Sequence, residues 1–157
     1  MSIIEFLRQT KIAFLKHELV HLILTLIIAG AFWLNFHDWH LLIACFLVGF
    51  LIDIDHLFDY FHFFGLKFKL KEFLNVESYI KPAAKVYVVL HGWEYIVLFW
   101  LIGRWIGVPG LEWAMSFSYL SHLLWDNFSF KHHPLAYSFI NRLINNFNLE
   151  AFNARGF

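Results

Sequence analysis

Acidic residues and histidines recur at helical spacing in several separate stretches of this sequence. Residues three or four positions apart lie on one face of a helix. Four such pairs occur: Asp53 with His56, Asp55 with Asp59, His91 with Glu94, and His122 with Asp126. Imidazole and carboxylate groups suit zinc, manganese or iron better than copper(I) or an iron–sulfur cluster. The pattern therefore predicts a metal site built from several helices.

The candidate ligands outnumber the positions around one tetrahedral zinc ion. They are His21, Asp53, Asp55, His56, His91, Glu94, His122 and Asp126. A regular helix turns by about 100° per residue, so Asp53 and Asp55 differ by about 200° and cannot reach one ion unless the helix is distorted. We expect two divalent ions, zinc in preference to manganese or iron, with His17 and Asp59 holding the imidazoles from behind.

The segments that carry these residues are apolar enough to lie in a membrane. The chain of 157 residues is 60% hydrophobic and only 15% charged, which is unusual for a soluble globular protein. A helix of about 20 residues crosses a bilayer, and four segments have that length: 19–36, 39–61, 83–106 and 111–130. We therefore expect an all-α integral membrane protein, with a four-helix bundle forming one domain over residues 1–157.

Shorter segments flank these four. Residues 3–16 and 134–149 combine apolar and polar positions, which predicts short amphipathic helices on the membrane surface. Between the second and third segments, residues 65–82 alternate apolar side chains with lysines at a period of two. That period favours an extended or hairpin-like connection.

Lysine and arginine are concentrated before the first segment, between the second and third, and after the fourth. Positive residues mark the cytoplasmic side of a membrane, so we expect an inner-membrane protein with both termini in the cytoplasm. The candidate ligands then lie in the cytoplasmic half, with His91 and His122 about 12 Å deep. The formal net charge is zero, which gives no reason to expect nucleic acid as a partner.

Three motifs resemble the YdjM-type inner-membrane proteins, which are predicted metal-dependent hydrolases. They are VHLILT around His21, IDIDH ending at His56, and YLSHLLWDNFS with His122 and Asp126. The resemblance covers residues 20–129 and implies a metal-dependent hydrolase. A more remote similarity to zinc-dependent phospholipases C implies phosphoester chemistry. The chain departs from the family at HGWEY, where Glu94 replaces a second histidine.

The expected reaction is hydrolysis by water that the metals activate, with Glu94 or Asp55 as general base. A site below the cytoplasmic headgroups favours a membrane lipid or lipid-linked phosphoester as substrate, with Lys131 and Arg142 contacting the phosphate. The same ligands also suit a di-iron oxidase or desaturase. A buried polar layer suits a metal or proton transporter as well, and the residues leave these alternatives open.

Overall fold

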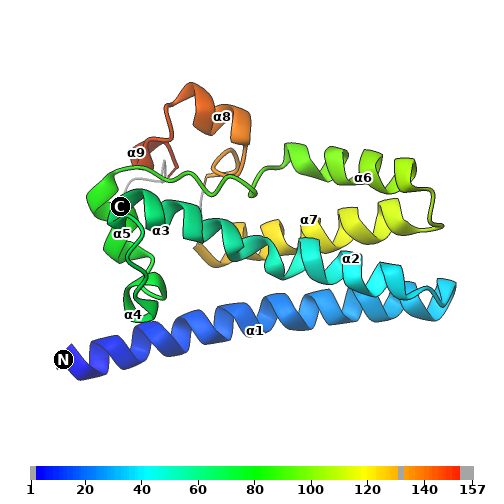
Figure 1. The fold of residues 1–157 in the computed structure, drawn as a ribbon, viewed down its shortest axis with the longest axis horizontal. Coiled ribbons are helices and arrows are strands. Elements are labelled where there is room, and N and C mark those ends of the chain that lie inside the picture. Colours follow the sequence, from blue (N-terminus) through cyan, green and yellow to red (C-terminus); the bar gives the residue numbers. More distant parts are fainter. Residues whose placement is uncertain (1–2, 131–132, 153–157) are drawn as a thin grey trace.

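The computed structural model describes residues 3–130 and 133–152, and this part of the chain is mostly helical and contains no strand (Figure 1). The all-α prediction is therefore confirmed. The elements are α1 (Ile3–Phe36), α2 (Trp39–Gly49), the 3₁₀ turn η1 (Leu51–Asp55), α3 (His56–Phe64), α4 (Leu70–Phe73), α5 (Glu77–Ala83), α6 (Glu94–Ile106), α7 (Leu111–Phe130), α8 (Phe139–Ile144) and α9 (Leu149–Phe152).

The four helices α1, α2, α6 and α7 run along the long axis of the molecule, and α7 packs against the other three (Figure 1). Its inward face carries small or polar residues, among them Ala114, Ser118 and His122, all fully or almost fully buried. Small side chains let helices approach closely. The connections α1–α2 and α6–α7 lie at one end, while α4, α5, α8 and α9 lie toward the other.

Gly49, the last residue of α2, lies where α1, α2 and α7 approach one another. A Cβ atom there would overlap Ser118 Oγ of α7 and lie 2.7 Å from Thr25 Oγ1 of α1. We expect Gly49→Ala to destabilise the protein by about 1–3 kcal/mol, because an added methyl must displace the Ser118 and Thr25 hydroxyl groups, and Ser118 Oγ donates to the Cys45 carbonyl. Gly30→Ala is the matched control, since a Cβ at Gly30 meets nothing within 4 Å. Equal thermal midpoints for the two variants in detergent would contradict this close packing.

The second predicted segment, 39–61, is a broken helix rather than a regular one. After α2 the chain makes the tighter turn η1 before it continues as α3, and the two helical parts are bent by 45°. A 3₁₀ turn advances about 120° per residue, so Asp53 and Asp55 lie about 120° apart instead of the roughly 160° of a regular helix. The distortion considered in the sequence analysis is therefore present.

The other predicted boundaries also need correction. Helix α1 is continuous, so no break separates residues 3–16 from the apolar part that follows. The third segment, 83–106, is helical only from Glu94 onward, and the connection 65–82 contains the helices α4 and α5 instead of extended chain. Ser138 caps α8, which therefore starts later than the predicted helix 134–149. Only the fourth segment, 111–130, matches its helix at both ends.

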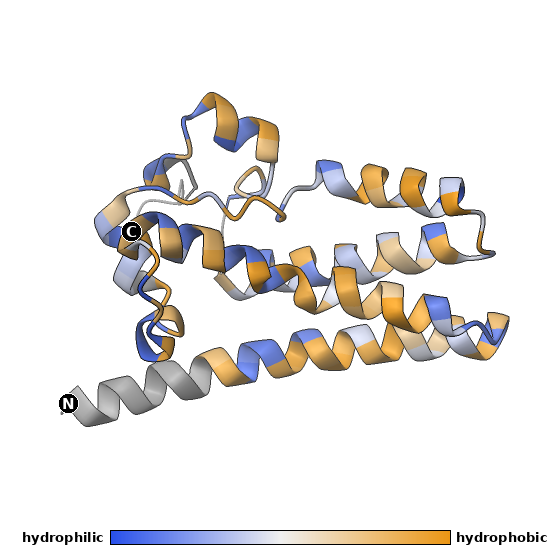
Figure 2. Ribbon diagram, viewed as in Figure 1, coloured by the Kyte–Doolittle hydropathy of each residue, from blue (hydrophilic) through white to orange (hydrophobic). Residues whose placement is uncertain are grey.

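Within the described residues, one helix is long and apolar enough to cross a membrane: the part of α1 from Phe14 to Phe36. The bent pair Trp39–Gly49 and Leu51–Phe64 would add a second crossing if it forms one span. The prediction of four spans is therefore not confirmed. Only 17% of the apolar window in α1 is buried inside the molecule, and Figure 2 shows hydrophobic residues along much of this helix.

Candidate metal centre

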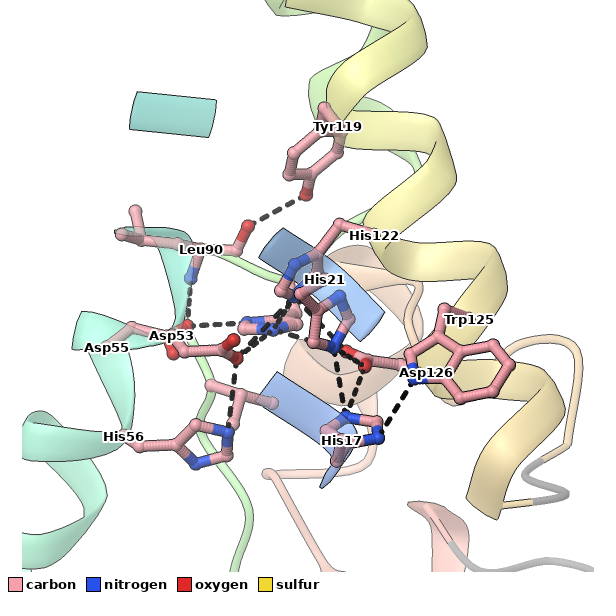
Figure 3. A network of polar contacts seen from close by, with 12 residues as sticks. His17, His21, Asp53, Asp55, His56, Leu90, Tyr119, His122, Trp125 and Asp126 are labelled. Atoms are coloured by element: carbon pink, nitrogen blue, oxygen red, sulfur yellow. Dashed lines mark hydrogen bonds and ion pairs between the residues drawn. The ribbon is translucent and has the colours of Figure 1, made fainter. Parts of the chain in front are cut away.

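Histidines and carboxylates from α1, η1, α7 and the segment before α6 meet at one place (Figure 3). The central cluster consists of Asp53, His91, His122 and Asp126, which offer ligand atoms that all lie within 4.8 Å of one another. Nε2 of His91 lies 3.1 Å from His122 Nε2, 3.2 Å from Asp53 Oδ1 and 3.4 Å from Asp126 Oδ2. Nε2 of His122 lies 3.5 Å and 3.3 Å from the same two oxygens. Two nitrogens and two oxygens thus converge.

The hydrogen bonds of the two Nδ1 atoms determine whether the Nε2 atoms of His91 and His122 carry protons. His91 Nδ1 lies 2.9 Å from Asp55 Oδ2, and His122 Nδ1 lies 3.1 Å from the Gly49 carbonyl oxygen. Because ionised carboxylate and carbonyl oxygens only accept hydrogen bonds, each Nδ1 carries a proton and donates it. In the neutral imidazoles, both Nε2 lone pairs then face the centre together with the carboxylate oxygens.

Four acceptor atoms at this separation cannot hydrogen-bond to one another, so a positive charge must lie among them. Protons on the Nε2 atoms would also supply positive charge, because each N–H could donate to Asp53 or Asp126 at 3.2–3.5 Å. A divalent ion satisfies all four atoms at once, and two imidazole nitrogens with two carboxylate oxygens can form a tetrahedral zinc site. The geometry of these four residues is therefore compatible with a metal ion.

A flanking cluster consists of His17, His21 and Asp126. Asp126 Oδ1 lies 2.8 Å from His21 Nε2 and 3.0 Å from His17 Nε2. The Trp125 indole N–H donates to His17 Nδ1 at 3.1 Å, and an indole nitrogen can only donate. A neutral His17 therefore carries its proton on Nε2 and donates it to Asp126. Both α1 histidines contact Oδ1, with their own Nε2 atoms 3.0 Å apart, while Oδ2 faces the central cluster.

A third group joins Asp55 and His56 to His91. Asp55 Oδ2 accepts hydrogen bonds from His91 Nδ1 and from the Leu90 N–H, at 2.9 and 2.7 Å. The Tyr119 hydroxyl of α7 donates to the Leu90 carbonyl at 2.7 Å. His56 Nε2 lies 3.7 Å from the nearest Asp53 oxygen. Asp55, predicted as a ligand, thus lies behind His91 and orients it.

Asp59 and Arg142 bind the irregular segment that carries His91. Asp59 accepts the N–H groups of Tyr87 and Val88 at 2.7 and 2.8 Å. Arg142 donates to the carbonyls of Tyr87 and Val88 at 2.5 and 2.9 Å and also to that of His91. Buried backbone groups need partners, and these two side chains supply them where no helix does.

Two predicted roles are corrected by this arrangement. Asp59 binds backbone amides and no imidazole. Arg142 is 3% exposed and its guanidinium is occupied by carbonyl oxygens, so it is not placed to bind a substrate phosphate. Burial lowers the pKa of the Arg142 guanidinium from its usual value, and the negative charge of Asp55 opposes that shift. Lys131, the other predicted phosphate contact, lies outside the described residues.

Glu94 belongs to none of the three groups. Its carboxylate caps the start of α8 by accepting from three donors: Ser138 Oγ at 2.6 Å, Phe139 N–H at 3.0 Å and Ile140 N–H at 3.2 Å. Negative charge is favourable at a helix N-terminus. The spacing argument that paired Glu94 with His91 does not apply, because α6 begins only at Glu94. The structure therefore does not bring Glu94 to the centre as ligand or base.

Glu18 lies on α1 three residues before His21, and none of the predicted pairs included it. It is half-buried on α1, and its carboxylate interacts electrostatically with Asp53, His122 and Asp126. The signal that could have found it is HELVH, residues 17–21. His-Glu-x-x-His on a helix is a zinc-hydrolase pattern in which the histidines bind the metal and the glutamate activates water.

No family model, curated protein or solved structure matches this chain. The resemblance to the YdjM-type proteins therefore remains a prediction from three motifs. The function has to be argued from the geometry of the site.

Proposed function

We propose that this protein is a metal-dependent hydrolase embedded in a membrane, with a divalent ion in the central cluster. The observation that carries the proposal is the central cluster of Asp53, His91, His122 and Asp126, whose ligand atoms all lie within 4.8 Å of one another. The mixed nitrogen and oxygen ligands favour zinc, with manganese or iron as weaker candidates. We assign one ion to this cluster in place of the two expected, because it is the group with four converging ligand atoms and the other two offer three each.

The opening of the site is on the side of Asp53. Its side chain is 20% exposed, whereas those of His91, His122 and Asp126 are 1%, 0% and 5% exposed. A divalent ion held by these four residues would need a further position for water, whose pKa it would lower, and it would polarise the bond to be cut. The buried residues hold the ion, and the substrate approaches past Asp53.

The outer surface of the bundle supports a position within a membrane. Each of the four long helices exposes large apolar side chains, for example Leu26, Leu47, Leu101 and Leu124, which are 53% exposed or more. An apolar surface of this extent marks contact with lipid or with another protein. The apolar part of α1 begins at Phe14, and His21 lies seven residues further along the helix. At about 1.5 Å per residue, the proposed site lies about 10 Å from the start of this apolar part.

The proposed substrate is a lipid or lipid-linked phosphoester of the cytoplasmic leaflet. The connection that carries Lys67, Lys69 and Lys71 lies at the end of the bundle nearer the cluster (Figure 1), and positive residues mark the cytoplasmic side. The HELVH motif points to a second candidate, cleavage of a peptide bond within the membrane, because the same pattern serves metalloproteases. Here, however, the two histidines of the motif contact Asp126 and are not members of the central cluster.

A substrate screen with zinc-loaded protein in detergent separates these candidates. Release of phosphate or a headgroup from vesicles of phosphatidylethanolamine and phosphatidylglycerol, absent with His122→Ala, would support the phosphoesterase. Cleavage of a membrane-spanning peptide with the same dependence would support the protease. Bound iron with oxygen-dependent spectral changes would indicate an oxidase, and zinc flux into vesicles a transporter; either result would contradict the hydrolase.

A further inference from the structure

Hydrolysis at this site needs a group that accepts a proton from water, and most nearby carboxylates are already occupied. Asp126 is held by two histidines of α1. Asp55 binds His91 and a backbone amide through Oδ2, which leaves its buried Oδ1 without a hydrogen-bond partner among the described residues, and Asp59 binds two backbone amides. Glu94 caps α8. Glu18 differs from all of them, because no hydrogen bond joins it to another residue that the structure describes.

The position of Glu18 on α1 directs it toward the cluster. It precedes His21 by three residues, so the two side chains lie about 60° apart around the helix. The His21 ring stacks on that of His122, with 3.9 Å between ring centroids. The electrostatic interactions of Glu18 with Asp53, His122 and Asp126 agree with this placement. Glu18 therefore lies at the edge of the central cluster without being one of its four members.

We propose that Glu18 is the catalytic base of this site. Its carboxylate takes a proton from a water molecule as the oxygen of that water forms a bond to the phosphorus or carbonyl carbon of the substrate. As the substrate bond breaks, Glu18 returns the proton to the departing oxygen or nitrogen, so no other reactant is consumed. This inference rests on the proposed function but holds for both candidate substrates.

His56 is the competing base. It is half-buried, its Nε2 faces Asp53 at 3.7 Å, and its Nδ1 has no hydrogen-bond partner among the described residues. His17 is less suitable, because Trp125 and Asp126 occupy both of its nitrogens. The variant His56→Gln therefore belongs in the test of Glu18.

The test uses cobalt-substituted protein and acetohydroxamic acid, which binds a metal as an anion after a neighbouring base accepts its proton. Glu18→Gln should keep the cobalt content of the wild type but bind acetohydroxamic acid at least about tenfold more weakly, since it loses a charge-assisted hydrogen bond. Hydrolysis of whichever substrate the screen identifies should fall by about 100-fold or more. Glu112→Gln, a buried carboxylate at the far end of α7, should match the wild type.

Loss of cobalt from Glu18→Gln would overturn the inference by making Glu18 a ligand. Unchanged acetohydroxamate binding would overturn it as well, and so would loss of that binding in His56→Gln alone. Glu18→Asp, which keeps the carboxylate on a shorter side chain, should recover part of the affinity and also serves if the glutamine variant does not fold. A wild-type protein that binds no metal would instead reject the proposed function.

Discussion

Asp126→Asn is expected to remove the bound metal while leaving the protein folded. The carboxylate of Asp126 joins the two clusters, with Oδ2 toward the central imidazoles and Oδ1 toward the α1 histidines. An asparagine keeps the shape, and its amide can donate to the Nε2 lone pairs of His91 and His122 while its oxygen accepts from His17. The substitution thus supplies donors where the wild type needs a cation, and removes a negative charge.

Changing a residue that only supports a metal ligand lowers metal affinity by about 10- to 100-fold. Because Asp126 is proposed as a ligand itself, we expect zinc affinity to fall by more than about 100-fold. Zinc content after dialysis, measured by mass spectrometry, tests this. The matched control is Glu112→Gln, another buried acidic residue on α7, whose partner Arg104 lies 3.6 Å away. Asp126→Asn that retained zinc like this control would show that Asp126 is not a ligand.

Arg142→Met is expected to give the largest loss of stability. Methionine fills a similar volume but donates no hydrogen bond, so the carbonyls of Tyr87, Val88 and His91 lose their partner. Leaving buried polar groups unpaired costs about 1–3 kcal/mol each, and water entering the gap offsets part of that cost. We expect a total of about 3 kcal/mol, which lowers the thermal midpoint of a chain of this size by roughly 6–12 °C.

Arg104→Met is the control for this substitution. Arg104 is 63% exposed and its pair with Glu112 is long, at 3.6 Å, so its removal should change stability by less than about 0.5 kcal/mol. Because the Arg142 contacts position His91, zinc binding should also weaken in Arg142→Met and not in Arg104→Met. Equal unfolding midpoints would show that the guanidinium does not hold the segment before α6.

Local patterns in the sequence were sufficient for part of this structure. Helical spacing and hydropathy identified α7 at both ends, and all four residues of the central cluster were among the predicted ligands. His122 and Asp126 lie on one turn of a regular helix, so their relation is visible in the sequence alone. The motif HELVH is equally local, and Glu18 could have been recognised from it.

The irregular segments could not be predicted because long-range contacts produce them. Residues 84–93 leave the helical conformation where Asp59 and Arg142 bind their backbone, and Arg142 lies 51 positions after His91. Glu94 is likewise occupied by a helix that begins 45 positions later. In the sequence these residues resemble ligands and phosphate contacts, since nothing local shows that distant backbone groups satisfy them.

X-ray absorption spectroscopy of the zinc-loaded protein tests the central claim most directly, because it reports the atoms bound to the metal. We predict two imidazole nitrogens and at least two oxygens at about 2.0–2.2 Å, with about one zinc ion per chain. Loss of one imidazole in His122→Ala would identify that ligand. A zinc ion surrounded by oxygens alone, or a folded protein that retains no metal, would contradict the account and leave the cluster a buried polar network.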